Sequence, residues 1–307
     1  MIMKRISTTL ALMAFAIVMT AQGLFVGTYN VRYANSDDAE EGNGWTRRVP
    51  VLCGMINFEE PDIFGTQEAL IGQLKDMLKL LPQYDYIGVA REDGKEDGEH
   101  SAIFYRKDKF KLLDHGDFWL SETPDKPSLG WDAACVRICT WGKFKDTKTK
   151  LQFYYFNLHM DHVGRVARRE GAKLVMQKIH EIAGDKAPVI LTGDFNVDQH
   201  DEIFSIFKQS GLLSDAYEVA EHRFAENGTF TAYMTDRFTK SRIDHILVTK
   251  NFKVRRYGVL TNAYWTPRED SVEHGSSNTS REFRMARFDR RMPSDHYPVF
   301  AKIEYHK

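Results

Sequence analysis

Short hydrophobic runs alternate with amphipathic stretches along the whole chain, and this alternation constrains the fold more than any other feature. Runs such as 24–32, 151–159 and 188–193 have strand length and are rich in β-branched and aromatic residues. The stretch 164–183 instead repeats apolar residues at helical spacing, with Val175 on the apolar stripe. Strands and helices mixed in this order predict an α/β fold in which helices cover the sheets.

The same patterns locate the individual elements. The chain divides roughly into two halves near Thr149, but no low-complexity linker lies there, so we expect a single compact domain. The predicted helices are 46–58, 69–80, 164–183 and 200–209, and the predicted strands are 24–32, 62–67, 84–91, 101–106, 111–119, 133–144, 151–159, 188–193, 243–249 and 298–305.

Five of the hydrophobic runs end in a small cluster of carboxylates, side-chain amides or histidines. Oxygen ligands suit a hard dication, and amides and imidazoles can hold phosphate oxygens and move protons. Because such sheets present functional side chains at the ends of their strands, the clusters together predict a phosphoester-cleaving metal site. They occupy positions 29–31, 66–69, 157–162, 191–196 and 293–296.

The candidate metal ligands, or holders of ligands, are Asn30, Glu68 and Asp295, each of which ends or follows a predicted strand. Taken alone, an asparagine after a strand is a common turn residue, and a glutamate that opens a helix is a favourable N-terminal charge. The metal interpretation therefore rests on the clusters occurring together in one chain.

Asp194 and Asn196 stand two residues apart after the run 188–193. If the chain is still extended there, both side chains point the same way. The carboxylate can then take a proton from water while the amide beside it holds the phosphate. The alternative is a turn, because glycine, aspartate and asparagine all form turns readily.

Two histidines and two further acids complete the candidate site. His159 and His296 are the imidazoles, and Asp244 lies inside a predicted strand. A buried acid must be paired, and orienting a histidine is one such pairing. Glu99, which precedes the strand 101–106, can orient the other imidazole. A single histidine or aspartate on a strand is usually structural, but this joint arrangement favours catalysis.

The site residues lie in the motifs Thr28-Tyr-Asn30-Val-Arg32, Gly65-Thr-Gln-Glu68-Ala, Asn157-Leu-His159, Gly193-Asp194-Phe-Asn196, Ile243-Asp244-His and Ser294-Asp295-His296. With these motifs the chain resembles the endonuclease/exonuclease/phosphatase superfamily, which includes pancreatic deoxyribonuclease, AP endonucleases, neutral sphingomyelinases and deadenylases. The resemblance extends over roughly residues 24–305 and is greatest to a bacterial exported branch. It implies a deoxyribonuclease-like four-layer sandwich, in which two packed mixed β-sheets are flanked by helices and the site lies at one rim.

The resemblance also implies a metal and a nucleophile. Mg²⁺ or Mn²⁺ is expected to bind through Glu68, with Asn30 and Asp295 nearby. Asp194 is expected to position or deprotonate the attacking water, and Asn196 to hold the phosphate.

The resemblance gives each histidine a partner. It implies that His296 contacts the scissile phosphate and is oriented by Asp244. It implies that His159 assists the phosphate or the leaving group, and Glu99 falls where the deoxyribonuclease branch pairs an acid with that histidine.

We therefore expect a metal-dependent phosphoesterase that directs water at a phosphodiester in one in-line step. Nucleic acid, a phospholipid head group and a small diester are the candidate substrates. The preference for a diester over a phosphomonoester rests on family analogy alone. The competing class is a catalytically silent binding module on the same fold, which should have lost at least one of Glu68, Asp194, Asn196 or His296; all four are present.

The N-terminus has the form of a secretory signal. Lys4 and Arg5 precede an apolar stretch at 10–19, and small residues follow at 21–23. Ten apolar residues are too few to span a bilayer. We expect residues 1–22 to be a signal peptide, and the protein to be periplasmic or extracellular.

The mature chain, expected at 23–307, is nearly balanced in charge. Removing residues 1–22 removes two of the 42 basic residues and none of the 43 acidic ones, which leaves a formal charge of −3. A chain with this balance lacks the broad basic face that drives affinity for long nucleic acids. The charge therefore argues weakly for a small phosphoester or a loosely held polymer.

The segment 262–293 is expected to be an irregular insertion, with five arginines between 281 and 291. One interpretation is an ordinary solvated loop. The other is a mobile flap that captures the substrate, with Arg287, Arg290 and Arg291 nearest the metal.

The three cysteines, Cys53, Cys135 and Cys139, are expected to be buried free thiols. The last two lie four residues apart on a predicted strand, too far apart for an unstrained disulfide.

Overall fold

The computed structural model describes residues 22–275 and 277–306. Its helices are α1 (Ser36–Glu40), α2 (Trp45–Glu59), α3 (Ile71–Leu80), α4 (Arg165–Ala183), α5 (Glu202–Gln209) and α6 (Ala216–Val219). Its strands are β1 (Gln22–Asn30), β2 (Ile63–Gln67), β3 (Tyr84–Ile87), β4 (Ile103–Arg106), β5 (Phe110–Trp119), β6 (Ile138–Asp146), β7 (Gln152–His159), β8 (Val189–Asp194), β9 (Leu213–Asp215), β10 (His222–Phe224), β11 (Asp244–Thr249), β12 (Phe252–Val259), β13 (Tyr264–Pro267), β14 (Phe288–Arg291) and β15 (Val299–Tyr305).

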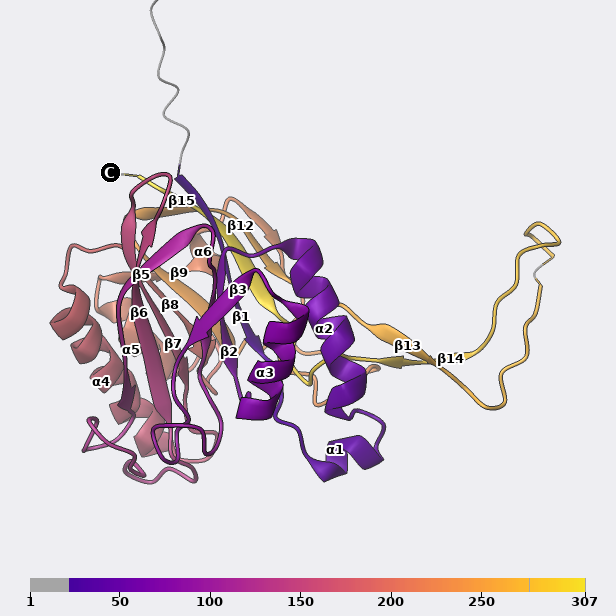
Figure 1. The fold of residues 1–307 in the computed structure, drawn as a ribbon, viewed down its shortest axis with the longest axis horizontal. Coiled ribbons are helices and arrows are strands. Elements are labelled where there is room, and N and C mark those ends of the chain that lie inside the picture. Colours follow the sequence, from indigo (N-terminus) through magenta and orange to yellow (C-terminus); the bar gives the residue numbers. More distant parts are fainter. Residues whose placement is uncertain (1–21, 276, 307) are drawn as a thin grey trace, which may run out of the picture.

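Two large mixed sheets form the centre of the molecule (Figure 1). The strand order is β10-β12-β15-β1-β2-β4-β3 in the first sheet and β5-β6-β7-β8-β11-β9 in the second. A separate two-stranded sheet consists of β13 and β14.

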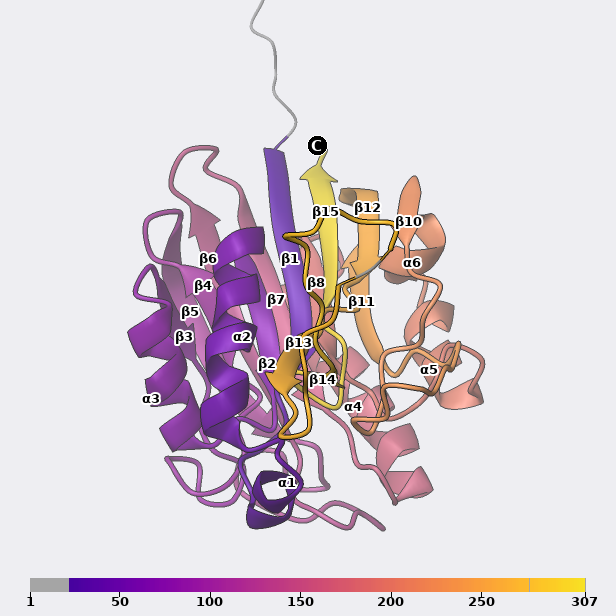
Figure 2. The same ribbon diagram turned by 90° about the vertical axis from the view of Figure 1, so that its right-hand side faces the viewer.

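Three apolar cores separate four layers. The core between the two sheets includes Val26 of β1 and Phe153 of β7. A second core joins the outer face of the second sheet to α4 and α5, through residues such as Val175 and Phe204. The third lies between the first sheet and the helices α2 and α3, and it includes Leu52. Figure 2 shows α2 and α3 lying over the first sheet. The predicted four-layer α/β sandwich is confirmed.

The helices begin and end where the local chemistry favours it. The side chain of Asp201 accepts a hydrogen bond from the backbone N–H of Ile203 at the start of α5. Gly184 follows the last residue of α4 with a φ of 70°, a conformation that glycine adopts without strain. These boundaries agree with the predicted helices to within two residues.

The register of the strands brings their polar ends together. In the first sheet, β1 and β2 are parallel and pair Asn30 with Gln67. In the second sheet, the parallel pair β7 and β8 places His159 opposite Asp194, and the antiparallel strand β11 places Asp244 opposite Asp194 on the other side. The polar clusters of both sheets therefore face the same rim of the sandwich.

All ten predicted strands correspond to observed strands, but some details differ. The strand predicted at 133–144 begins only at Ile138, so Cys135 lies before it in a loop. The strand β12 was not predicted, because a bulge between Val254 and Arg256 interrupts its alternating pattern. The cysteines are free thiols as predicted, although Cys135 is partly exposed.

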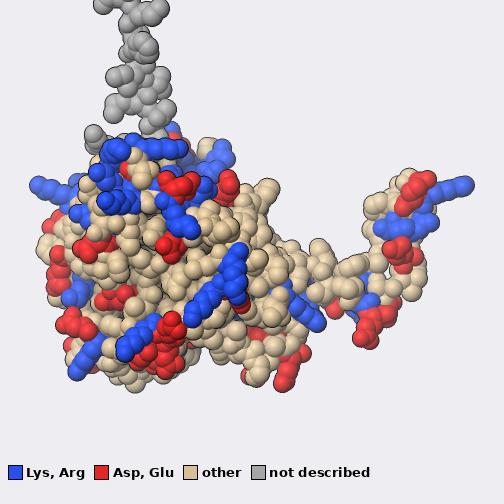
Figure 3. All heavy atoms as spheres, viewed as in Figure 1, with Lys and Arg blue, Asp and Glu red and all other residues tan. Residues whose placement is uncertain are grey.

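The segment 262–293, hereafter the arm, is not wholly irregular. Its ends form the antiparallel pair β13 and β14, and the chain between them extends away from the sandwich (Figure 1). Acidic and basic side chains are mixed along it (Figure 3).

The predicted signal peptide lies outside the described residues except for Gln22, where β1 begins. Export therefore stays a prediction. Among residues 22–275 and 277–306, no helix combines the length and the apolar composition needed to cross a membrane.

Candidate active site

A cavity of about 630 Å³ opens at the rim where the strand ends converge. Both sheets contribute to its walls, and two further predicted residues, Asn30 and Asp244, are fully buried behind it. The predicted residues that line the cavity are Glu68, Glu99, His159, Asp194, Asn196, Asp295 and His296. The structure therefore brings every predicted catalytic and metal residue to one place.

A buried arginine holds the segments that carry these residues. The guanidinium of Arg48, on α2, donates hydrogen bonds to the backbone oxygens of Val31 at 2.7 Å, Arg32 at 3.0 Å and Pro293 at 2.9 Å. These oxygens follow β1 and precede the segment 294–296. Arg48 therefore fixes the end of β1 against the segment that carries Asp295 and His296.

The side chain of Asn30 joins the two sheets at the site. Its Nδ2 donates to Glu68 Oε1 at 2.9 Å and to Asp194 Oδ2 at 3.0 Å. Its Oδ1 accepts from the backbone N–H of Arg32 at 3.0 Å. This arrangement makes Asn30 a holder of the two carboxylates, one of the two roles predicted for it.

Asp194 lies between the two imidazoles. Its Oδ2 is 3.5 Å from His159 Nε2 and 3.7 Å from His296 Nε2. Burial and the nearby Asp244 carboxylate raise the pKa of Asp194 to about 7. A carboxylate with such a pKa is suited to accept a proton at neutral pH.

His296 and Asp244 form the predicted pair. His296 Nδ1 donates to Asp244 Oδ2 over 2.8 Å, and both side chains are almost fully buried. Burial alone would lower the pKa of His296, but the charges of Asp244, Asp194 and Asp295 raise it well above its ordinary value. His296 is therefore a cation at neutral pH.

The predicted pairing of Glu99 with His159 is not observed. Glu99 Oε2 is 3.8 Å from His159 Nδ1, beyond hydrogen-bond distance, and it accepts instead from Arg91 Nη1 at 2.5 Å. The position at Nδ1 is taken by Arg137, whose Nη1 lies 3.1 Å away. Burial, with the charges of Arg137 and Arg91, lowers the pKa of His159 well below its ordinary value. His159 is therefore neutral, and an arginine orients it where an acid was expected.

Asn196 adopts the turn that the sequence left as the alternative. Its φ is 49°, and its backbone N–H donates to Asp194 Oδ1 at 2.9 Å, so the chain is no longer extended after β8. The amide Nδ2 donates to the backbone oxygen of Met160 at 2.9 Å and still lines the cavity. The turn brings Asn196 to the site by a different route from the one expected.

Oxygen donors for a metal gather at one end of the cavity. Arg32 Nη1 lies 4.0 Å from Glu68 Oε2 and 3.7 Å from Asp295 Oδ2, so the two carboxylates share one guanidinium. Burial, and to a lesser extent the charge of Glu68, raises the pKa of Asp295, so a bound cation would favour its ionised form. Carboxylate oxygens in such a place fit Mg²⁺ or Mn²⁺. Glu68, Asp194 and His296 also lie within 4.8 Å of one another, but a protonated imidazole is no ligand.

Arginines line the cavity, but they are not the predicted ones. Arg291 donates to the backbone oxygen of Glu41 and thereby fixes the base of the arm. Neither it nor Arg287 or Arg290 lines the cavity, because the arm extends away from the rim. Their predicted place nearest the metal is therefore wrong in this structure. The lining arginines are Arg32, Arg91 and Arg137.

One of these lining arginines, Arg137, could have been noticed in the sequence. Arg137 is a lone charge in the apolar run 133–141, and a buried charge has to be paired. Its partners lie more than twenty residues away, so the pattern could indicate that it is paired but not with what.

The chain is similar to known proteins over most of its length. The sequence profile of the Endonuclease/Exonuclease/phosphatase family matches residues 27–296. A solved endonuclease/exonuclease/phosphatase family protein from Bacteroides thetaiotaomicron is 50% identical, with a TM-score of 0.87 over 94% of this chain and 99% of that one. The mannosyl-6-phosphatase of Bacteroides thetaiotaomicron VPI-5482 is also 50% identical, with a TM-score of 0.85 over 92% of this chain and 100% of that one.

A more distant relative matches only in part. An uncharacterized protein of Acanthamoeba polyphaga mimivirus is 31% identical over 163 residues, which are 50% of this chain. The match spans 60% of the length of that viral protein.

Proposed function

This chain belongs to the endonuclease/exonuclease/phosphatase family of hydrolytic phosphoesterases, and on that basis we propose that it is a divalent-metal-dependent phosphomonoesterase acting on a phosphorylated sugar. The observation that carries the proposal is the 50% identity to a mannosyl-6-phosphatase, which this chain matches over 100% of that protein's length. The cavity adds groups that can bind phosphate, since three arginines and the protonated His296 line it beside four carboxylates. A terminal phosphate carries about −1.5 to −2 charges at pH 7, more than a diester, so it depends on these cations and on a bound dication for compensation.

The sugar comes from similarity. The mannosyl-6-phosphatase shares half of its residues with this chain and is matched along its whole length. That likeness supports a hexose phosphate more directly than the diester expected from the wider family.

Each residue of the site has a separate role in the proposed reaction. Asp194 takes a proton from the attacking water, and hydrogen bonds from Asn30 Nδ2 and from the backbone N–H of Asn196 fix its orientation. His296, held by Asp244, donates to a phosphate oxygen and offsets the charge that develops in the transition state. Glu68 and Asp295 would hold the dication, which when bound neutralises charge on the phosphate and on the leaving oxygen.

Two further groups hold the phosphate on its other side. The neutral His159 donates through Nε2, because its Nδ1 accepts from Arg137. One N–H of the Asn196 amide donates to the backbone oxygen of Met160. The other N–H donates a hydrogen bond to the phosphate.

A phosphodiester is the second candidate substrate. Phe230 lines the cavity, is 42% exposed, and lies with its ring centroid 5.0 Å from that of His296. Its exposed face offers an apolar surface to a second ester group. A phosphomonoester carries more negative charge than a phosphodiester and has no second ester group. A series of substrates of both kinds therefore separates the two candidates.

The test compares matched esters. Purified protein with Mg²⁺ or Mn²⁺ is assayed on mannose 6-phosphate, glucose 6-phosphate, p-nitrophenyl phosphate, bis-p-nitrophenyl phosphate, DNA, RNA and sphingomyelin. We expect kcat/KM for a hexose 6-phosphate to exceed that for every diester by roughly a hundredfold or more, because each unpaired charge in the cavity costs a few kcal/mol. A diester cleaved faster would overturn the proposal, and binding without turnover would indicate a silent module.

Metal dependence gives a second expected result. Glu68→Gln keeps the shape of the side chain but removes the charge that a hard dication needs, so the apparent Kd for Mg²⁺ should rise by about 10–100-fold. Turnover should vanish in chelator and return with added Mg²⁺. Calorimetric titration of Mg²⁺ gives the affinity, and Glu96→Gln, on an exposed ion pair with Lys75, is the control. Full activity in chelator would contradict the metal assignment.

A further inference from the structure

The guanidinium of Arg137 contacts three side chains at the wall of the cavity. Its Nε lies 3.4 Å from Asp161 Oδ2, its Nη1 lies 3.1 Å from His159 Nδ1, and its Nη2 lies 2.9 Å from His162 Nδ1. The side chain is only 5% exposed. One buried guanidinium therefore bridges two histidines that both line the cavity.

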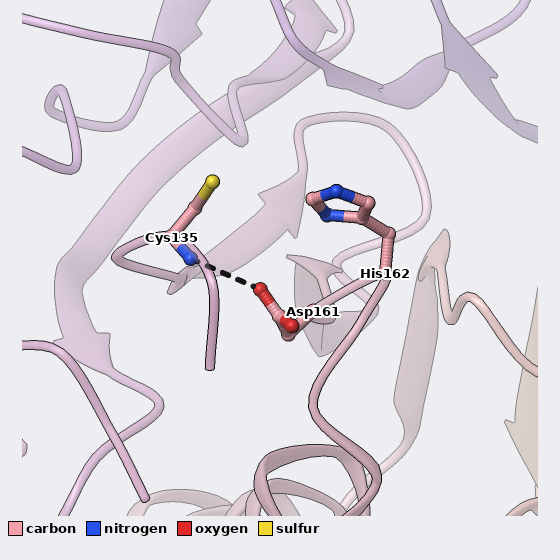
Figure 4. A group of neighbouring side chains, drawn as sticks. All are labelled: Cys135, Asp161 and His162. Carbon is pink, nitrogen blue, oxygen red and sulfur yellow. Dashed lines mark hydrogen bonds between the residues drawn. The ribbon is translucent and has the colours of Figure 1, made fainter. Parts of the chain in front are cut away.

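A group of possible metal ligands next to Arg137 holds the guanidinium in place and does not form a second metal site. Cys135, Asp161 and His162 lie within 4.8 Å of one another (Figure 4). However, Asp161 Oδ1 accepts from the backbone N–H groups of Val163 at 2.9 Å and Gly164 at 2.6 Å. Its Oδ2 accepts from the backbone N–H of Cys135 at 3.2 Å and from the guanidinium.

These bonds leave Asp161 no free lone pair for a metal. Burial opposes ionisation, but hydrogen bonds from the backbone and the charge of Arg137 lower the pKa of Asp161 to about 2. Asp161 is therefore a fixed anion, and it fixes Arg137 in turn.

The geometry determines where the histidine protons are. A guanidinium can only donate hydrogen bonds, so the Nδ1 atoms of His159 and His162 must both accept. A neutral imidazole that accepts at Nδ1 carries its proton at Nε2. A second proton on either ring would break the bond to Arg137 and place a cation beside a cation.

We propose that Arg137 is a positioning residue that presents the Nε2–H groups of His159 and His162 as a pair of donors to the terminal oxygens of the bound phosphate. The inference rests on the proposed phosphomonoesterase function. It names the pair of histidine donors as the feature that lets the cavity bind a terminal phosphate. The positive charge of Arg137 adds to the attraction without contacting the substrate. Glu99 is released from His159 by this arrangement and pairs with Arg91.

A purely structural role is the alternative. In that case Arg137 would only tie the loop after β7 to the loop before β6 through Asp161. The orientation of the two histidines would then be incidental, and their tautomers would not depend on position 137.

The first test uses the unaltered protein and needs no activity. Long-range ¹H–¹⁵N spectra of histidine-labelled protein report which ring nitrogen carries the proton, and His159→Gln and His162→Gln assign the signals. We expect both rings to be protonated at Nε2 and unprotonated at Nδ1 near neutral pH. A proton on Nδ1 of His159 would overturn the proposal even if no variant folds.

The second test uses inorganic phosphate as the probe. Arg137→Met keeps the apolar stem of the side chain but cannot donate, and Arg137→Lys keeps the charge but cannot bridge two rings. We expect the inhibition constant of phosphate and the KM for a phosphomonoester to rise by about 10–100-fold in Arg137→Met, the range known for groups that orient histidine ligands. Arg137→Lys should recover part of the loss.

Arg168→Met is the matched control. Arg168 Nη1 donates to the backbone oxygen of Asp161 at 2.9 Å, so its loss loosens the same loop without touching either histidine. Equal losses in Arg137→Met and Arg168→Met, with unchanged histidine tautomers, would reduce Arg137 to a structural residue.

The two proposals can fail separately. If the protein hydrolyses no phosphomonoester, direct titration with phosphate still measures the binding of that probe. Weaker phosphate binding in Arg137→Met, with Nε2–H tautomers in the unaltered protein, would then support the positioning role while the proposed function falls.

Discussion

Asp194→Asn is expected to lower kcat by about 10²–10⁴-fold, the usual contribution of a general base. The amide keeps the volume of the carboxylate and its place opposite the two imidazoles, but it cannot take a proton from water. Steady-state kinetics on the best hexose phosphate give the change in kcat. KM should change little, because the groups that hold the phosphate are untouched.

The pH dependence of activity in the unaltered protein should also report on Asp194 as the general base. Asp194 acts as a base only when ionised, and burial with the charge of Asp244 raises its pKa to about 7. The value of kcat/KM should therefore fall as the pH is lowered through about 7. A dication bound beside Glu68 would move this fall to lower pH, since a nearby cation favours the carboxylate. The residual activity of Asp194→Asn should lack that fall.

Ionisation of Asp194 as the pH rises should increase activity but lower the stability of the fold. Because the pKa of Asp194 is higher in the folded protein than in the unfolded chain, its ionisation costs folding free energy as the pH rises from about 4 to above 7. Asp194→Asn removes this cost, so the variant should be as stable as the unaltered protein or more stable above pH 7. Thermal unfolding monitored by circular dichroism gives the comparison.

A nearby aspartate supplies the control. Asp198 accepts from the backbone N–H of His200 and from the hydroxyl of Ser241, and it does not line the cavity. Asp198→Asn should leave kcat nearly unchanged. Normal turnover in Asp194→Asn would show that another group activates the water.

The parts of this molecule that follow from local pattern were predicted well. Short hydrophobic runs predicted the ten strands that build most of both sheets, and the polar clusters at their ends predicted the residues that meet at the rim. Asn30, Glu68 and Asp194 could be chosen from one sequence because each directly follows a buried run. Their convergence then depends only on strand register, which buried faces specify strongly.

The parts that depend on long-range packing were missed. Glu99 was paired with His159 because it precedes a predicted strand and falls where the deoxyribonuclease branch pairs an acid with that histidine. In the structure, the loop before β6 brings Arg137 closer to the Nδ1 of that ring. The arginines of the arm were placed at the metal because they precede Ser294 in the sequence. The pairing of β13 with β14 instead directs that segment away from the rim. Adjacency along the chain does not determine position in space when a β-ribbon intervenes.

The last expected result concerns the pair of His296 and Asp244. His296→Ala removes the cation that faces the phosphate, so kcat should fall by about 10²–10⁴-fold. Asp244→Asn should reproduce part of this loss, about 10–100-fold at neutral pH, because an amide can still contact Nδ1 but supplies no charge. Both values come from the same kinetic assay.

The pH profile separates a loss of charge from a loss of packing. The charge of Asp244 is the largest influence that opposes burial and raises the pKa of His296. Without it burial prevails, and the pKa of His296 should fall to or below the ordinary value of about 6.5. The activity of Asp244→Asn should therefore decline as the pH rises through about 6–7, a range in which the unaltered His296 keeps its proton.

The sign of this change is what a merely structural Asp244 could not produce. Asp117→Asn is the control, since Asp117 is a partly buried strand carboxylate that accepts from Thr140 Oγ1 at 2.6 Å and does not line the cavity. It should alter stability without altering the shape of the pH profile. If Asp244→Asn keeps both the rate and the profile of the unaltered protein, the charge on His296 does not depend on Asp244. The cationic imidazole would then have to be sustained by Asp194 and Asp295, whose charges also raise its pKa.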